Sequence, residues 1–158
     1  MALASCLVDT NILLRVASRS GAEHPVVDRA LAQLAGQGTI LHYTLQNMAE
    51  FWNVMTRPKA RNGFEFSSLE AEREVRAIES GMTLLPDNAA VYSQWRRIVV
   101  QYGVSGVQVH DARLAAAMYV HGVTHILTLN VADFSRFAGL TALHPENAKR
   151  NSEDIAGS

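Results

Sequence analysis

The sequence predicts an α/β fold in which a mostly parallel sheet of four to five strands is covered by helices on both faces. Short apolar segments without a helical period alternate along the chain with longer segments that carry apolar residues at helical spacing. Such alternation supplies the crossover connections that parallel strands need. The 158 residues, 48% hydrophobic and 18% charged, suit one globular domain with a core of its own.

The first half of the chain predicts two strands and four helices. Apolar residues 5–8 and 39–43 lack a helical period and predict buried strands. Helices are expected where an apolar stripe follows a capping residue or an early proline, and glycines or Pro58 end them. The helices expected from these signals cover residues 10–17, 25–34, 45–55 and 69–78.

The second half predicts the remaining strands and two further helices. A helix capped by Asp87 is expected near residues 91–99, and another starts at Val109 or His110 and ends at Gly122. The segments that predict short strands are residues 82–85, 125–129 and 140–143. The expected order is therefore β-α-α-β-α-α-β-α-α-β-α-β.

No linker or shift in composition divides the chain. Residues 1–143 are expected to form one domain, and the polar, aperiodic residues 144–158 a C-terminal tail. The N-terminus lacks the basic region of a secretory signal, and no segment approaches the ~20 apolar residues that span a bilayer. The single cysteine, Cys6, excludes an internal disulfide. We therefore expect a cytoplasmic protein without a membrane segment.

Acidic side chains are predicted to meet at one edge of the sheet. Asp9 directly follows the first strand, and Asn130 and Asp133 follow the fourth. Glu50 lies about two turns into the helix after the second strand, and Asp111 begins the helix before the fourth strand. Because chemistry in open α/β sheets collects at the carboxyl ends of the strands, the four acids are expected to form a cluster.

Clustered carboxylates repel one another, which raises their pKa values unless a positive charge lies between them. A hard divalent cation removes the repulsion, and oxygen ligands favour Mg²⁺, with Mn²⁺ as a possible substitute. Each acid also has a structural explanation, since Asp9 and Asp111 can cap helices. Glu50 can be a solvated helix residue, and Asp133 can belong to a turn. The predicted convergence favours a metal site over these separate explanations.

Four motifs carry a resemblance to a known family. They are Val8-Asp9-Thr10-Asn11, Asn47-Met48-Ala49-Glu50-Phe51, His110-Asp111-Ala112 and Leu127-Thr128-Leu129-Asn130-Val131-Ala132-Asp133-Phe134. In this order and spacing, the chain resembles the PIN domain, and in particular the VapC-type toxins of type II toxin–antitoxin pairs. The resemblance implies a PIN-like three-layer sandwich and a magnesium-dependent endoribonuclease that hydrolyses RNA phosphodiesters.

The resemblance also implies roles for single residues. Asp9, Glu50 and Asp111 match the first three acidic positions of the family and are expected to hold the metal. At the fourth, Asn130 stands where many PIN domains have an acid and Asp133 supplies a nearby carboxylate, so both stay candidates. The residues expected to support the acids are Thr10, Asn11, Thr128 and Asn130.

The partners that the resemblance implies are RNA, a small antitoxin seated between the early helices and the fourth helix, and a second copy of the chain. The net charge of −1 does not predict a broad nucleic-acid-binding surface, so RNA contacts need a local basic rim. The candidate side chains for this rim, each of which also fits ordinary solvated surface, are Arg15, Arg57, Lys59, Arg61 and Arg113.

Two other classes of function are compatible with the sequence. Asn130 favours a catalytically weak PIN-like module that acts by binding RNA or a partner. A haloacid-dehalogenase-like phosphatase also begins with an Asp after its first strand, but it needs a second Asp where this chain has Asn11. That alternative also leaves Glu50 without a role.

Overall fold

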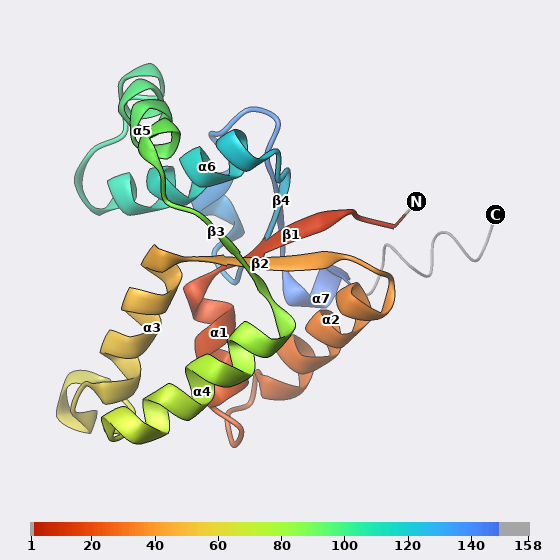
Figure 1. Ribbon diagram of the computed structural model, residues 1–158, viewed down its shortest axis with the longest axis vertical. Coiled ribbons are helices and arrows are strands. Elements are labelled where there is room, and N and C mark those ends of the chain that lie inside the picture. The colour runs from red at the N-terminus through yellow and green to blue at the C-terminus, as the bar shows by residue number, and fades with distance from the viewer. Residues whose placement is uncertain (1, 149–158) are drawn as a thin grey trace.

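A single five-stranded sheet forms the centre of the molecule (Figure 1). The structure is a computed structural model that describes residues 2–148. The strand order is β3-β2-β1-β4-β5, and every neighbouring pair is parallel, as the sequence predicts. The strands are β1 (Ser5–Val8), β2 (Ile40–Thr44), β3 (Thr83–Leu85), β4 (His125–Leu127) and β5 (Thr141–Leu143).

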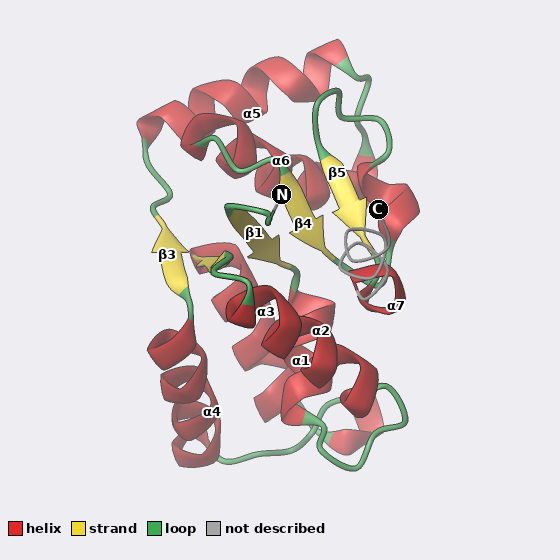
Figure 2. Cartoon of the chain, turned by 90° about the vertical axis from the view of Figure 1, so that its right-hand side faces the viewer, coloured by secondary structure: helices red, strands yellow, loops and turns green. Residues whose placement is uncertain are grey.

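Helices cover both faces of the sheet, which confirms the three-layer sandwich. The helices are α1 (Thr10–Ala17), α2 (His24–Gly36), α3 (Leu45–Thr56), α4 (Ser68–Gly81), α5 (Ala89–Gln101), α6 (Val109–His121) and α7 (Pro145–Ala148). The 3₁₀ turns are η1 (Lys59–Arg61), η2 (Gly106–Gln108) and η3 (Val131–Phe134). Figure 2 shows α5 and α6 on one side of the sheet and the other helices on the opposite side. None of the helices among residues 2–148 is long and apolar enough to cross a membrane.

Alternation along β1 divides the core into two parts. Leu7 packs with the buried residues of α5 and α6, whereas Cys6 and Val8 pack with those of α1 to α4. All three side chains are fully buried. A strand that is apolar on both faces is what a sheet covered on both sides requires.

The strand order places a topological switch point beside β1. After β1 the chain builds β2 and β3 on one side, and it then returns to add β4 and β5 on the other. The ends of β1 and β4 therefore open onto the same edge, where α3 begins directly after β2. This arrangement brings segments from distant parts of the sequence to one place.

Two predicted boundaries differ from the structure. Asn88, and not Asp87, caps α5, because its side chain accepts a hydrogen bond from the N–H of Val91 (3.1 Å). Strand β4 ends at Leu127 and not at residue 129. The backbone leaves the sheet because the N–H of Leu129 donates to the side chain of Asn11 (3.2 Å).

The first residues of the expected C-terminal tail form the short helix α7. Its N–H groups at Asn147 and Ala148 donate to the carbonyl of His144, and it contacts α2. Pro145 and Ala148 are buried, so the expectation of an aperiodic tail is wrong for residues 145–148. The rest of that expected tail, residues 149–158, lies outside the described residues.

Candidate active site

Asp9 is fixed by hydrogen bonds on both of its carboxylate oxygens. It follows β1 and caps α1, and its Oδ1 accepts a hydrogen bond from the N–H of Thr10 (2.7 Å). Its Oδ2 accepts from the hydroxyl of Thr128 (2.8 Å). Only 8% of Asp9 is exposed. The structural and the functional explanations of Asp9 are therefore compatible, because the cap also fixes the direction of the carboxylate.

Thr128 joins the end of β4 to the start of α1. Its buried hydroxyl oxygen accepts hydrogen bonds from the Asn11 side chain (3.3 Å) and from the N–H of Asn130 (3.0 Å). Since the same hydroxyl donates to Asp9, one side chain sets the position of Asp9 relative to the loop after β4. Asn11 and Thr128, which the sequence singles out as supporting residues, thus lie beside Asp9.

Glu50 also belongs to this network. Its Oε2 accepts a hydrogen bond from the hydroxyl of Thr10 (2.7 Å), and its Oε1 accepts from Nε2 of Gln46 (3.0 Å). The Thr10 oxygen in turn accepts from the buried side chain of Asn47 (3.1 Å), which completes the capping box of α3 with Thr44. Glu50 is therefore held toward Thr10 and the start of α1, and is not a freely solvated helix residue.

Gln46 is a site residue that sequence reasoning missed. Its side-chain amide, which donates to Glu50, also donates to the carbonyl oxygen of His110 (3.0 Å). Gln46 therefore ties α3 to the first turn of α6, next to Asp111. It is 7% exposed, and its Oε1 has no hydrogen-bond partner among the described residues. The available signal was its spacing of four residues before Glu50 on one helix.

The four acids act on one another electrostatically. Burial, followed by the charges of Asp133, Asp9 and Glu50, raises the pKa of Asp111 to about 6, and His110 partly opposes this shift. Burial also raises the pKa of Asp9, with a smaller contribution from the charges of Glu50 and Asp133. Hydrogen bonds from Thr128 and Thr10 work against that increase. Asp9 and Asp111 therefore both lie within electrostatic reach of Glu50 and Asp133.

Asp133 supplies the charge at the fourth position. It lies exposed in η3, and its carboxylate raises the pKa of both Asp9 and Asp111. Asn130 is exposed as well, and its backbone N–H is bound to Thr128. The structure thus places Asn130 in the supporting network and Asp133 within electrostatic reach of the other acids.

The donor set fits a hard divalent cation. All four side chains offer carboxylate oxygens, the ligand type that Mg²⁺ prefers, and a cation relieves their repulsion. Within residues 2–148, no group of three or more His, Cys, Asp or Glu side chains is already close enough to hold a metal. However, no described residue forms a side-chain hydrogen bond with Asp111 or Asp133, so both can turn toward a cation.

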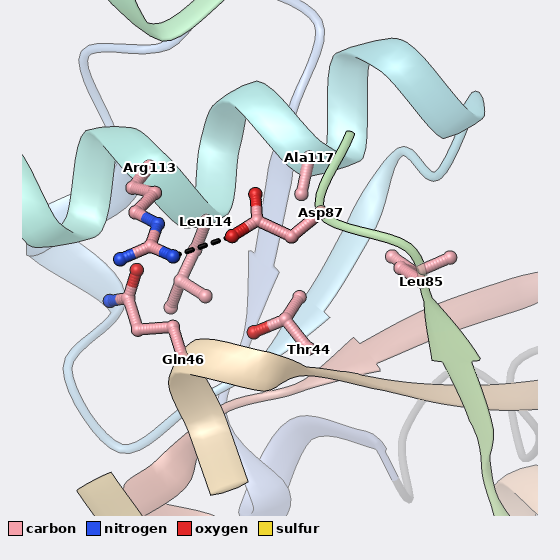
Figure 3. Close-up of a pocket in the computed structure, with 7 residues that line it drawn as sticks. All are labelled: Thr44, Gln46, Leu85, Asp87, Arg113, Leu114 and Ala117. Atoms are coloured by element: carbon pink, nitrogen blue, oxygen red, sulfur yellow. Dashed lines mark hydrogen bonds and ion pairs between the residues drawn. The ribbon is translucent and has the colours of Figure 1, made fainter. Parts of the chain in front are cut away.

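One of the five basic candidates, Arg113, lies beside this network. Its guanidinium forms an ion pair with Asp87 (2.5 Å) next to Gln46, as Figure 3 shows. Arg15 pairs instead with Glu23, and Arg57 donates to the carbonyl of Asn62. The other two, Lys59 and Arg61, lie in η1 beyond the C-terminal end of α3, at the end far from the sheet (Figure 1).

The sequence profile of the PIN domain family matches residues 6–140, a span that contains all four acids. The chain belongs to the PIN domain family. Membership confirms the family resemblance read from the four motifs, and it leaves no support for the haloacid-dehalogenase-like alternative. No curated protein matches this PIN domain in sequence.

Several solved structures with a similar fold are described as toxins or toxin–antitoxin complexes. VapBC2 from Rickettsia felis, bound to a DNA fragment from their promoter, gives a TM-score of 0.67 at 15% identity, over 89% of this chain and 98% of that chain. A toxin–antitoxin complex from Klebsiella pneumoniae gives 0.60 at 19% identity, over 89% and 97%. VapC20 from Mycobacterium tuberculosis, described as a sarcin-ricin loop cleaving toxin, gives 0.57 at 16% identity, over 77% and 86%. At these identities the similarity concerns the fold of the PIN domain.

Proposed function

We propose that this protein is a magnesium-dependent endoribonuclease that hydrolyses RNA phosphodiesters, and that it is the toxin of a toxin–antitoxin module. The electrostatic influence of Glu50 and Asp133 on Asp9 and Asp111, together with the raised pKa values of these two acids, supports this proposal most directly. Membership of the PIN family and the similarity in fold to toxin–antitoxin proteins support it further.

In this mechanism Asp9 and Asp111 hold Mg²⁺, or Mn²⁺ in its place, while Glu50 and Asp133 bind it directly or through water. The bound cation would supply an activated water and neutralise charge on the phosphate. The protein orients two of the acids: the hydroxyl of Thr10 donates to Glu50, and the hydroxyl of Thr128 donates to Asp9 and favours the ionised form of Asp9. No nucleophilic side chain is needed.

Replacing Asp9 with Asn tests this mechanism. Asp9→Asn keeps the size of the side chain and the acceptor for the N–H of Thr10, so the fold should persist. Loss of one metal ligand should lower the rate of RNA cleavage at least about a hundredfold. Cleavage of a labelled RNA by purified protein with Mg²⁺ measures this effect, and excess EDTA should abolish wild-type cleavage. Asp28→Asn, at an exposed position of α2, is the matched control. Undiminished cleavage by Asp9→Asn, or by wild type in EDTA, would refute the mechanism.

A catalytically weak PIN-like module that binds RNA or a partner is the second candidate. Two observations favour it: Asn130 stands where many PIN domains have an acid, and no described group of three acids already forms a metal site. A metal titration separates the two candidates. For a metal enzyme, Mg²⁺ at about 100 times its Kd should raise Tm by about 5–10 °C. The shift should be smaller in Asp9→Asn, whereas the binding module should show neither a shift nor cleavage.

The antitoxin is proposed to bind along a groove between α1, α2 and α4. This groove encloses about 320 Å³ and is lined by apolar side chains that include Leu13, Leu31 and Ile78, with Arg19 and Glu74 forming an ion pair there. Its dimensions and lining suit the apolar face of a helical peptide. We further propose that the protein forms homodimers and acts in the cytoplasm.

A further inference from the structure

A second pocket, of about 520 Å³, lies between α5 and the first turn of α6. Its volume falls within the range of small-molecule sites. Apolar and aromatic side chains form much of its wall, and Tyr92 is 59% exposed. The side chains that matter for its chemistry are Asp87, Asn88, Tyr92, Trp95, His110 and Arg113.

Hydrogen bonds and an ion pair hold these walls in place. The indole N–H of Trp95 donates to the carbonyl of Val109 (2.9 Å), which fixes the ring against α6. The rings of Tyr92 and Trp95 lie 6.4 Å apart with a 36° tilt. Asp87 holds the guanidinium of Arg113 (2.5 Å), and Figure 3 shows this ion pair among the residues of a neighbouring, smaller pocket. A ligand would therefore meet aromatic faces and a cation that are already positioned.

These groups match the chemistry of a nucleobase. A base has flat aromatic faces, which stack on Tyr or Trp, and polar edges, which pair with donors and acceptors. The pocket offers two aromatic rings, the guanidinium of Arg113 and the imidazole of His110. The positive charge of Arg113 is already neutralised by the carboxylate of Asp87, so an uncharged base suits the pocket.

The pocket and the proposed acidic site both use residues near the N-terminus of α6. His110 and Arg113, which line the pocket, stand on either side of Asp111 in the first turn of α6. Gln46 donates to the carbonyl of His110 and to Glu50 with the same amide. An RNA phosphate at the acids would thus have a neighbouring base beside this pocket. We propose that the pocket binds the nucleobase next to the cleaved phosphate, an inference that rests on the proposed ribonuclease function.

The kinetic test uses Tyr92, whose exposed ring can be removed without opening the core. Because Tyr92→Ala removes a ring on which the base would stack, it should raise KM for a short oligoribonucleotide about tenfold and change kcat less. Tyr92→Phe, which keeps the ring, should restore most of the affinity. The control is Val100→Ala, at an exposed position of α5 that does not line the pocket.

A scan of abasic nucleotides then identifies the base. Removing the base at one position beside the cleaved bond should raise KM for the wild type about tenfold. The same removal should raise KM little further in Tyr92→Ala, because this variant has already lost the stacking interaction with the base. The base pocket is refuted if removal of a base raises KM equally in the wild type and in Tyr92→Ala at every position, and if both proteins have the same KM for the intact substrate. That result would leave the ribonuclease proposal unaffected.

A binding test separates this inference from the nuclease itself. In a Trp52→Phe, Asp9→Asn background, Trp95 is the one remaining tryptophan of the sequence. Quenching of its fluorescence by nucleoside monophosphates, lost in Tyr92→Ala, supports the pocket even if the wild type cleaves no RNA. If Tyr92→Ala instead converts a dimer to a monomer in sedimentation, with no change in quenching, the pocket is an interface between copies and the inference fails.

Discussion

At the scale of residues, the hydroxyls of Thr10 and Thr128 do most to order the acidic site. Each donates a hydrogen bond to one acid and accepts a hydrogen bond from another side chain, so Glu50 and Asp9 are oriented by uncharged groups. Within residues 2–148, no lysine or arginine side chain forms a hydrogen bond or ion pair with any of the four acids. Burial, and after it the repulsion among these charges, raises the pKa values of Asp9 and Asp111.

Asp111→Asn should stabilise the metal-free protein at neutral pH. The pKa of Asp111 rises from an ordinary value of 3.8 to about 6 on folding, because burial and neighbouring acids disfavour its charge. The stability that its proton contributes is complete below 3.8 and is lost as the pH rises through about 6. The variant carries no such charge, so its Tm in EDTA should exceed that of the wild type at pH 7.5.

The difference in Tm should shrink toward pH 4, where the wild-type carboxyl is protonated. Calorimetry in EDTA at several pH values measures it, with the exposed Asp28→Asn variant as the control. With saturating Mg²⁺ the Tm of the wild type should exceed that of Asp111→Asn, because only the wild type gains the full free energy of Mg²⁺ binding. A difference in Tm that does not depend on pH would contradict the role assigned to burial and repulsion at Asp111.

The sequence predicted a cluster of acids, but it did not reveal how neutral residues hold Asp9 and Glu50. Asp9, Glu50 and Asp111 are visible because a charge interrupts apolar segments at the ends of predicted elements. Gln46 lies on a helix with no unusual neighbours, and its role depends on the position of the His110 carbonyl. That contact joins residues 64 positions apart, so local patterns do not contain it.

At the scale of elements, the loop between α3 and α4 folds back along the end of α3. The N–H groups of Phe64 and Phe66 donate to the carbonyls of Val54 and Met55, and the two phenyl rings meet edge to face. Gly63 makes this return possible, since a Cβ at this position would lie 1.9 Å from the carbonyl oxygen of Arg57. The loop in turn sets where α4 begins.

Gly63→Ala should therefore destabilise the protein. The added methyl group can fit only if the backbone moves, and overpacking of this kind costs about 1–3 kcal/mol. Thermal or urea unfolding measures the change, and Tm should fall by about 3–10 °C. Gly36→Ala, where nothing lies within 4 Å of the new Cβ, should have little effect. Equal stability of the two variants would show that the loop adapts and that this contact does not constrain it.

Most element types follow from periodicity, and the exceptions have physical causes. The five strands and six long helices were expected because each carries an apolar pattern long enough to recognise. Helix α7 escaped notice because it has four residues and is mostly polar. Its burial depends on contact with α2, more than one hundred positions earlier in the chain. The capping of α5 was misassigned because Asp87 and Asn88 are both good capping residues.

At the scale of the whole molecule, the proposed antitoxin groove and the acidic site are separate surfaces. The groove is lined by α1, α2, α4 and nearby residues, whereas the acids lie at the carboxyl edge of the sheet. A change in the groove should therefore release inhibition without affecting cleavage. Such separation makes the partner proposal testable independently of the nuclease mechanism.

Ala77→Arg should abolish neutralisation by the antitoxin. Ala77 is exposed on α4 and lines the groove, so a long charged side chain would fill it without disturbing the core. Co-expression with the antitoxin should no longer rescue growth, and affinity between the purified proteins should fall at least tenfold, or about 1.4 kcal/mol. RNA cleavage in vitro should be unchanged. Ser80→Arg, exposed on α4 but outside the groove, is the control, and equal rescue of both variants would place the antitoxin elsewhere.

The order in which the ribosome makes these surfaces has a consequence for the proposed toxin. Every residue that lines the groove lies between Leu13 and Met82, whereas Asp111, β4 and Asp133 are synthesised later. Asp9 acquires its hydrogen bond from Thr128 only after β4 has paired with β1. A growing or prematurely terminated chain therefore contains the groove before it contains a complete set of acids. An antitoxin that binds this groove can reach the chain before the nuclease exists.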